Sequence, residues 1–153
     1  MRFFRLLAVC SILPTVLLAA DSPFTGTWKL NSAKSHLPDN SVKSSTANVQ
    51  ADDQNFSLKQ EFVDDKGQTS NISVEAKFDG KDYPVKGDPD TDSMAFQRVN
   101  DHELKITYKK AGQVSGRSVA TVSKDGKTTT LKFTDYKDGK ATNRGSAVYD
   151  KAE

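Results

Sequence analysis

A stretch of strict alternation at residues 24–30 constrains the fold of this chain more than any other feature. Its apolar and small residues share one face of an extended segment: Phe24, Gly26, Trp28 and Leu30. A period of two, with threonine and lysine on the opposite face, is typical of a half-buried β-strand. Gly26 has no Cβ and would let the Trp28 ring lie flat against the backbone. The stretch therefore predicts a first strand with one buried face.

The same alternation returns roughly every ten to thirteen residues, with turn-forming residues between the alternating segments. Asp-Gly pairs at 79, 125 and 138 are hairpin signals, and at Asp79-Gly80 we expect a type I′ turn, in which both central residues have positive φ. No segment after residue 20 shows a convincing helical period. Successive hairpins give an antiparallel meander, which generally closes to remove its edges. The sequence thus predicts an all-β fold, a single antiparallel meander barrel of about 8–10 strands. We expect strands at residues 24–30, 42–49, 55–63, 72–78, 81–85, 94–99, 104–109, 114–123, 129–133 and 141–149.

The first twenty residues have the pattern of a secretory signal peptide. Arg2 and Arg5 give a positive start, an apolar run follows, and Ala19-Ala20 offers a small-residue cleavage site. The apolar run is too short for a membrane span. We therefore expect residues 1–20 to be a cleaved signal peptide and residues 21–153 to form the barrel domain. The mature protein would be exported, either periplasmic or secreted, and would keep no membrane span.

The cysteine and charge content exclude several classes of site. The one cysteine, Cys10, lies in the expected leader, so the mature domain would have no disulfide and no cysteine metal site. The chain has 22 basic and 20 acidic residues, and two of the basic ones leave with the leader. The mature domain would then carry equal numbers of each, and no basic patch is long enough to indicate a nucleic-acid partner.

The chain resembles the calycin superfamily of lipocalins and fatty-acid-binding proteins. The resemblance rests on Gly26-x-Trp28 in the first strand, followed by an all-β meander over the rest of the chain. The opening at 24–30 and the ending at 147–152 are similar to those of fatty-acid-binding proteins. The segment 79–85, with Gly87-Asp88-Pro89 after it, is similar to a group of uncharacterised exported bacterial lipocalin-like proteins. The resemblance implies a barrel of the lipocalin or fatty-acid-binding-protein kind that binds a small hydrophobic ligand in its interior.

Two sets of residues are candidates for the functional interior. In the resembling families the first-strand tryptophan closes one end of the barrel beneath an arginine from a late strand, so we expect Gly26, Trp28 and Arg144 to form this closure, with Arg98 and Arg117 as the other arginines that could stack on the indole. The inward face of the strands supplies the candidate ligand-binding residues. These are Phe56, Leu58, Phe62, Ile72, Val74, Phe78, Leu104, Ile106, Tyr108 and Tyr149.

One departure from the fatty-acid-binding proteins bears on the ligand. Those proteins hold the ligand carboxylate with an arginine two residues before the C-terminal tyrosine, and here that position is Ala147. Arg144 lies three residues away, on the opposite face of a regular strand. About eleven loop residues follow Leu30, too few for the helical lid of that family. The sequence therefore does not predict fatty-acid binding by the family's route.

Two function classes stay open on the sequence alone. The first is an exported binder of a small hydrophobic ligand, with the barrel interior as its pocket. The second is an interaction or inhibitor module of the cell envelope, with a filled barrel and function on the loops at 31–41 and 87–92. We expect no enzyme activity, no catalytic residues, no cofactor and no metal, since Asp88 to Asp92 imitates only the first half of a calcium loop. We also expect a monomer.

Overall fold

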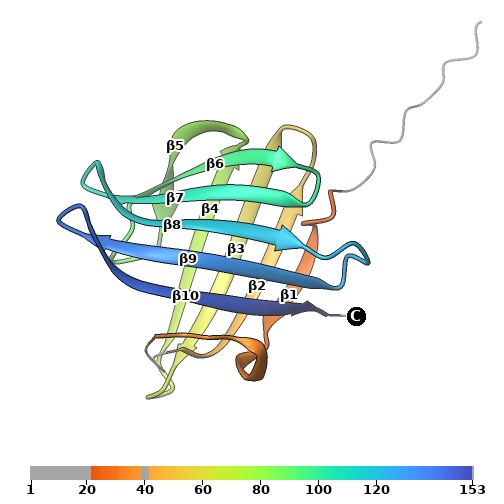
Figure 1. Ribbon diagram of the computed structural model, residues 1–153, viewed down its shortest axis with the longest axis horizontal. Helices are drawn as coiled ribbons and strands as arrows, with labels where there is room; N and C mark the ends of the chain where they lie inside the picture. Colours follow the sequence, from red (N-terminus) through yellow and green to blue (C-terminus); the bar gives the residue numbers. More distant parts are fainter. Residues whose placement is uncertain (1–21, 39–41, 153) are drawn as a thin grey trace, which may run out of the picture.

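The computed structural model describes residues 22–38 and 42–152, and these form a closed barrel (Figure 1). Every strand pairs antiparallel with the next one in the sequence, and β10 returns to pair with β1. The predicted all-β antiparallel meander barrel is therefore confirmed, with ten strands. The expected signal peptide at residues 1–20 lies outside the described residues. The elements are β1 (Gly26–Leu30), η1 (Ser32–Lys34), β2 (Val42–Ala51), β3 (Asn55–Asp64), β4 (Thr69–Lys77), β5 (Asp79–Lys86), β6 (Ser93–Asn100), β7 (Glu103–Lys110), β8 (Gln113–Val122), β9 (Thr128–Lys137) and β10 (Lys140–Lys151).

The period-two alternation places every second side chain inside the barrel. Because neighbouring strands are in register, inward residues form rows that cross several strands. One such row runs through Leu104, Ala120, Leu131 and Ala147, on β7 to β10. Phe96 and Leu104 are the largest of the described side chains that are fully buried. The alternation predicted from the sequence therefore decides which face of each strand meets the core.

The hairpin turns differ from the prediction at one Asp-Gly pair. At Asp138-Gly139 both residues have positive φ, 52° and 74°, as a type I′ turn requires. At Asp79-Gly80 the glycine alone has positive φ, so the type I′ turn predicted there is wrong. Asp79 is already an extended residue that pairs with Gln97 of β6, and the chain turns one residue earlier, at Phe78.

The segment between β1 and β2 crosses one end of the barrel, at the bottom of Figure 1. It contains one turn of 3₁₀ helix, η1, where the sequence shows no helical period. The Asn31 side chain caps this turn by accepting a hydrogen bond from Lys34 N (3.1 Å). His36 and Ser146 then exchange two backbone hydrogen bonds of 2.7 and 2.8 Å. These bonds tie the segment to β10 and bring the residues after it to the barrel interior.

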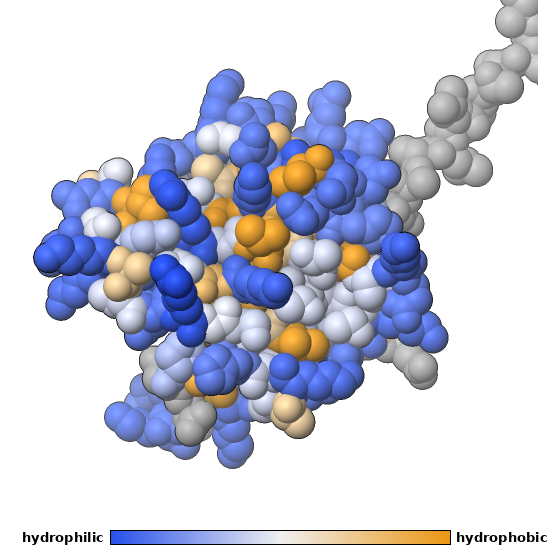
Figure 2. Space-filling model, viewed as in Figure 1, coloured by the Kyte–Doolittle hydropathy of each residue, from blue (hydrophilic) through white to orange (hydrophobic). Residues whose placement is uncertain are grey.

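The outer surface is mainly hydrophilic. On the face seen in Figure 2, hydrophobic residues show only as separate patches between charged side chains. Among the described residues, Val99 is the one large hydrophobic side chain that is exposed, at 46%. No helix within residues 22–38 and 42–152 has the length and apolar character needed to cross a membrane. The extensive apolar surface of the domain is therefore inside the barrel.

Candidate functional site

Two adjoining cavities lie inside the barrel. The outer cavity has a volume of about 260 Å³ and the inner cavity about 100 Å³. A dry apolar cavity of about 150 Å³ is enough to bind benzene in other proteins, so the outer cavity has room for a small organic molecule. Both cavities are lined mainly by apolar side chains from the inward faces of the strands. The residues that border both are Leu58, Gln60, Ile106, Tyr108, Leu131 and Tyr149.

The inner cavity lies beside Trp28, which is 3% exposed. The indole Nε1 donates a hydrogen bond of 2.8 Å to the backbone carbonyl of Phe24, so its polar atom is satisfied in the buried state. Phe24 also lines this cavity, and it belongs to the segment that leads into β1. Trp28 and Phe24 together fill this end of the barrel.

The cation over Trp28 is a lysine and not an arginine. Lys151 Nζ lies 5.2 Å from the centroid of the Trp28 ring. Gly26 makes this approach possible, because a Cβ at that position would lie 2.5 Å from Lys151 Cε. Arg144, expected from the sequence to take part in this closure, is exposed on β10. The other two arginines stack elsewhere, Arg98 on Phe78 and Arg117 on Tyr136.

A small polar network stands where the two cavities meet. Gln60 Nε2 donates to Ser45 Oγ at 2.9 Å and to Tyr149 Oη at 3.1 Å. Burial raises the pKa of Tyr149 above its ordinary value, although the hydrogen bonds to Ser45 and Gln60 lower it in part. The Tyr149 hydroxyl is therefore neutral at physiological pH and can donate as well as accept.

A second polar group borders the outer cavity around Gly116. Tyr108, Gly116, Asp135 and Asn143 are cross-strand neighbours in one row across β7 to β10, and Asn143 at the end of the row is exposed. A Cβ at Gly116 would lie 3.2 Å from Tyr108 Cδ2 and 3.6 Å from Asp135 Oδ1. The Tyr108 ring and the Asp135 carboxylate therefore already lie close to Gly116, and a side chain there would crowd the Tyr108 ring. Three members of this row line the outer cavity: Tyr108, Asp135 and Asn143.

The pKa of the Tyr108 phenol is raised above its ordinary value. Its hydroxyl lies 3.0 Å from Ser118 Oγ, the inward residue two positions beyond Gly116. Burial raises the pKa of Tyr108 to about 12, and the negative charges of Asp135 and Asp88 act in the same direction. Asp88 comes from the loop between β5 and β6 and also lines the outer cavity. Two carboxylates therefore face this part of the interior.

Among the described residues, the charged side chains that line the cavities are all acidic. Asp88 and Asp135 line the outer cavity, and no lysine, arginine or histidine among the described residues lines either cavity. Ala147 occupies the wall of the outer cavity at the position where fatty-acid-binding proteins carry their arginine. No group of three potential metal ligands occurs in residues 22–38 and 42–152. The chemistry that the site offers is an apolar enclosure with hydroxyl, amide and carboxylate oxygens.

Eight of the ten residues predicted for ligand binding line a cavity. Phe62 and Ile72 border the outer one, Phe56 and Leu104 the inner one, and Leu58, Ile106, Tyr108 and Tyr149 both. Val74 is buried in the core, and Phe78 packs on Phe56, so these two border neither cavity.

The sequence prediction missed several wall residues, and the alternation contained the signal for most of them. Gln60 lies between Leu58 and Phe62 on the inward face of β3, but the predicted set contains only apolar and tyrosine side chains. On β9, the alternation through residues 129, 131 and 133 of the expected strand continues directly to Asp135. On β6, the inward face was ambiguous from the sequence. The missed residues that line a cavity include Gln60, Met94, Phe96, Leu131, Phe133 and Asp135.

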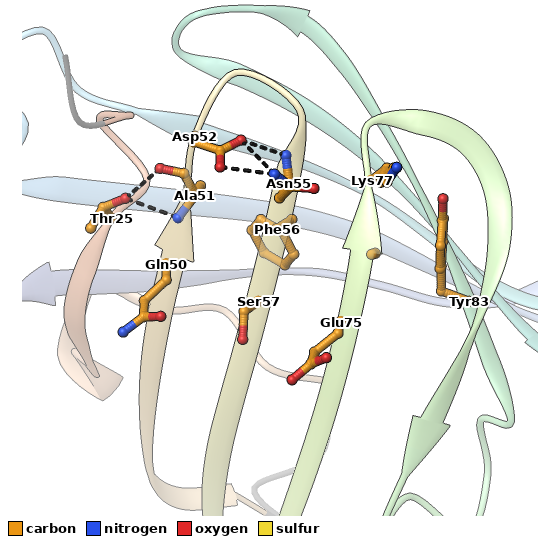
Figure 3. A pocket seen from close by; sticks show the side chains of 11 residues that line it. Thr25, Gln50, Ala51, Asp52, Asn55, Phe56, Ser57, Glu75, Lys77 and Tyr83 are labelled. Carbon is orange, nitrogen blue, oxygen red and sulfur yellow. Dashed lines mark hydrogen bonds between the residues drawn. The ribbon is translucent and has the colours of Figure 1, made fainter. Parts of the chain in front are cut away.

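A larger hollow of about 660 Å³ lies outside these two cavities and is an open groove (Figure 3). Gln50, Ser57 and Glu75 line it from three neighbouring strands. Asp52 at its edge accepts hydrogen bonds from the backbone and side chain of Asn55, and the side-chain bond is the main cause that lowers the pKa of Asp52. This carboxylate is thus engaged in closing the turn between β2 and β3. The groove offers no apolar enclosure comparable to that of the interior.

Comparisons of the chain with protein-family models, with curated proteins and with solved structures find no match. The architecture itself is clear from the strand order, in which each strand pairs with its neighbours in sequence and the ring closes between β1 and β10. The protein is a closed ten-stranded antiparallel β-barrel, an architecture compatible with the calycin superfamily.

Proposed function

We propose that this protein is an exported lipocalin-like binder that holds a small hydrophobic molecule in the interior of its barrel. The outer cavity is the observation that carries the proposal. It is an apolar space of about 260 Å³ bordered by a few convergent polar groups, which is the usual composition of a small-molecule site. Export is proposed from the signal-peptide pattern of the first twenty residues.

The alternative function, an interaction module acting through its loops, requires a filled barrel. Residues of both candidate loops instead help to line the outer cavity: Leu37 and Pro38 from the first, and Asp88 from the second. This arrangement favours the interior as the place where a ligand binds. The proposal assigns no chemical reaction to the protein.

Binding of an uncharged fluorescent probe, N-phenylnaphthylamine, tests the proposal. We expect saturable binding by the purified mature protein, with a change in the emission of Trp28, the single tryptophan of the chain. The Ala147→Phe variant places a ring in the wall of the outer cavity and should weaken binding tenfold or more. Ala95→Phe is the matched control, since Ala95 precedes the buried Phe96 on β6 and faces outward.

Two results would count against the proposal. The first is absence of saturable probe binding by a folded protein. The second is equal probe affinity of the Ala147→Phe variant, the Ala95→Phe variant and the wild type, which would place the probe on the outer surface. Export is tested separately by expression in a bacterial host. The mass of the exported protein should match a chain that begins at Asp21.

A further inference from the structure

We propose that the outer face of the sheet formed by β6 to β10 binds an acidic polysaccharide, a chain of sugars that carry carboxylate groups. These five strands lie side by side at the front of the barrel in Figure 1. The inference goes beyond the proposed function, because it concerns the outer surface and does not depend on a ligand inside the barrel.

The register of the strands gathers basic side chains that are distant in the sequence. Two neighbouring outward rows cross β6 to β10, and each row carries two cations. The first row runs through Gln97, Lys105, Val119, Lys132 and Ser146. The second row runs through Ala95, Thr107, Arg117, Thr134 and Arg144. We call the residues of these two rows the basic face.

The cations of the basic face have a regular arrangement. One stands on each strand from β7 to β10, alternately in the first and the second row. Neighbouring strands lie about 4.8 Å apart, so the four cations form a zigzag about 14 Å wide across the sheet. A linear chain with regularly spaced negative charges would meet these cations in succession.

The basic face has no acidic partner of its own. Ion pairs between described residues engage other cations, and none includes Lys105, Arg117, Lys132 or Arg144. On β5 the two rows end in Asp79 and Asp82, whose carboxylates are paired with Lys81 and Lys109. The charge of the basic face is therefore available to an anionic partner.

The side chains between the cations favour a sugar chain over a lipid surface. Thr107 and Thr134 flank Arg117 in the second row, while Gln97 and Ser146 stand at the ends of the first row. Their hydroxyl and amide groups can donate to and accept from sugar hydroxyls. No residue of either row is a large exposed hydrophobic side chain, which insertion into a membrane would require.

Part of the basic face is hollowed, which gives the sugars a place to lie. An open hollow of about 580 Å³ is lined by residues of β6 to β9 that include Lys105, Arg117 and Lys132. Arg117 Cζ lies 5.8 Å from the centroid of the Tyr136 ring, and this stacking leaves the guanidinium N–H groups free to bind a carboxylate. The hollow therefore combines room for a polar chain with three of the four cations.

Two polymers with one common backbone test the inference: polygalacturonate and its methyl ester, which has lost the charge. Their affinities for the mature wild-type protein are measured by isothermal titration calorimetry at low and at physiological salt. We expect polygalacturonate to bind about tenfold or more tightly than the ester at low salt. The difference should shrink at physiological salt, because salt screens charges that are exposed to solvent.

Charge-neutral variants locate the site. The quadruple variant Lys105→Gln, Arg117→Gln, Lys132→Gln, Arg144→Gln should bind polygalacturonate about tenfold or more weakly than the wild type. The matched control is the quadruple variant Lys59→Gln, Lys66→Gln, Lys77→Gln, Lys124→Gln. It changes the net charge equally at exposed positions outside the basic face, and it should bind as the wild type does.

A third variant tests whether the partner is a sugar chain. Thr107→Val, Thr134→Val keeps every charge and removes two hydroxyl groups from the second row. It should weaken the binding of polygalacturonate about threefold or more, while the dependence on salt stays the same. Circular dichroism checks that each variant is folded.

Several results would overturn the inference. One is equal binding of the two polymers by the wild type, or binding of neither. Another is the same loss in the control variant as in the variant of the basic face, since a general charge effect would then suffice. Polyglutamate or phosphatidylglycerol vesicles that bind as tightly as polygalacturonate would identify a peptide or a lipid surface as the occupant instead. Unchanged affinity of the threonine variant would contradict the choice of a sugar chain.

The proposed function is checked separately in the same proteins. N-phenylnaphthylamine, which reports the barrel interior, should bind the quadruple variant of the basic face as it binds the wild type. Failure of the interior binder and failure of the basic face are therefore distinguishable.

Discussion

The two ends of the barrel interior are built in opposite ways. At the inner end, Trp28 is buried, its Nε1 is bonded to the Phe24 carbonyl, and the cavity beside it measures about 100 Å³. At the outer end, the cavity measures about 260 Å³ and borders a row of polar side chains around Gly116. The inner end therefore resembles a protein core, and the outer end resembles a binding site.

Under the proposed function, one continuous sheet would serve stability at one end and ligand binding at the other. Close packing at the Trp28 end stabilises the fold, because removing an atom from a packed core loses buried contacts and leaves a cavity. Empty space and polar groups at the outer end contribute less to stability. We therefore expect substitutions at the inner end to change mainly the free energy of unfolding. Substitutions at the outer end should change mainly the affinity for a hydrophobic probe such as N-phenylnaphthylamine.

The largest expected effect is the loss of the tryptophan that fills the inner end. Trp28→Ala should lower the free energy of unfolding by about 3–5 kcal/mol, measured by urea titration followed by circular dichroism. Phe62→Ala, beside the outer cavity, should cost only about 1–2 kcal/mol, because that ring is partly exposed and borders empty space. Equal losses in the two variants would remove the contrast between the ends.

A pH titration sharpens the comparison at the outer end. Unfolded tyrosine releases its proton near pH 10, whereas the pKa of Tyr108 in the folded protein is raised to about 12. The unfolded state thus binds fewer protons in this window, and stability falls as pH rises. We expect Tyr108 to account for a loss of about 2–3 kcal/mol between pH 10 and pH 12. Tyr108→Phe should have a shallower decline, and an unchanged slope would contradict the assignment.

A substitution at Gly26 tests the close contact between this position and Lys151, the lysine over Trp28. The backbone φ of Gly26 is 144°, a value that residues with a side chain rarely adopt. A Cβ at this position would also meet Lys151 Cε. Gly26→Ala should lower the free energy of unfolding by about 1–2 kcal/mol. Adding Lys151→Ala should recover part of this loss, because it relieves the contact but leaves the backbone strain. A double variant as unstable as Gly26→Ala alone would show that the contact has no energetic weight.

The smallest effect concerns a polar atom at the inner end. Thr129 Oγ1 is buried beside the inner cavity and has no hydrogen-bond partner among the described residues. Thr129→Val keeps the shape of the side chain and removes the unsatisfied hydroxyl, so it should raise the free energy of unfolding by about 1 kcal/mol. Thermal unfolding checks this expectation, and a lower midpoint than the wild type would contradict it.

The sequence predicted most of the wall because the inward face repeats every second residue. Phe56, Leu58 and Phe62 follow the alternation on β3, and all three border a cavity. Gln60 and Asp135 follow the same alternation, but a polar residue in an apolar row can equally mark a turn, an edge or a binding group. Pattern alone does not separate these roles.

The cation over the indole shows the limit of the resemblance. Arginine was expected there, and Arg144 is exposed while Lys151 occupies the place. The choice depends on the pairing of Trp28 with Lys151 across β1 and β10, and on the absence of a Cβ at Gly26. Neither the pairing nor the clearance can be read from residue types.

The sequence by itself determined the all-β fold, the inward faces of most strands and the burial of Trp28, because these depend on periodicity and turn chemistry within short segments. Only the tertiary structure decided that Gly116 stands between Tyr108 and Asp135, that Asp88 faces the same space, and that empty volume remains inside the barrel. These features depend on the register between strands and on closure of the sheet, which bring together residues that are distant in the chain.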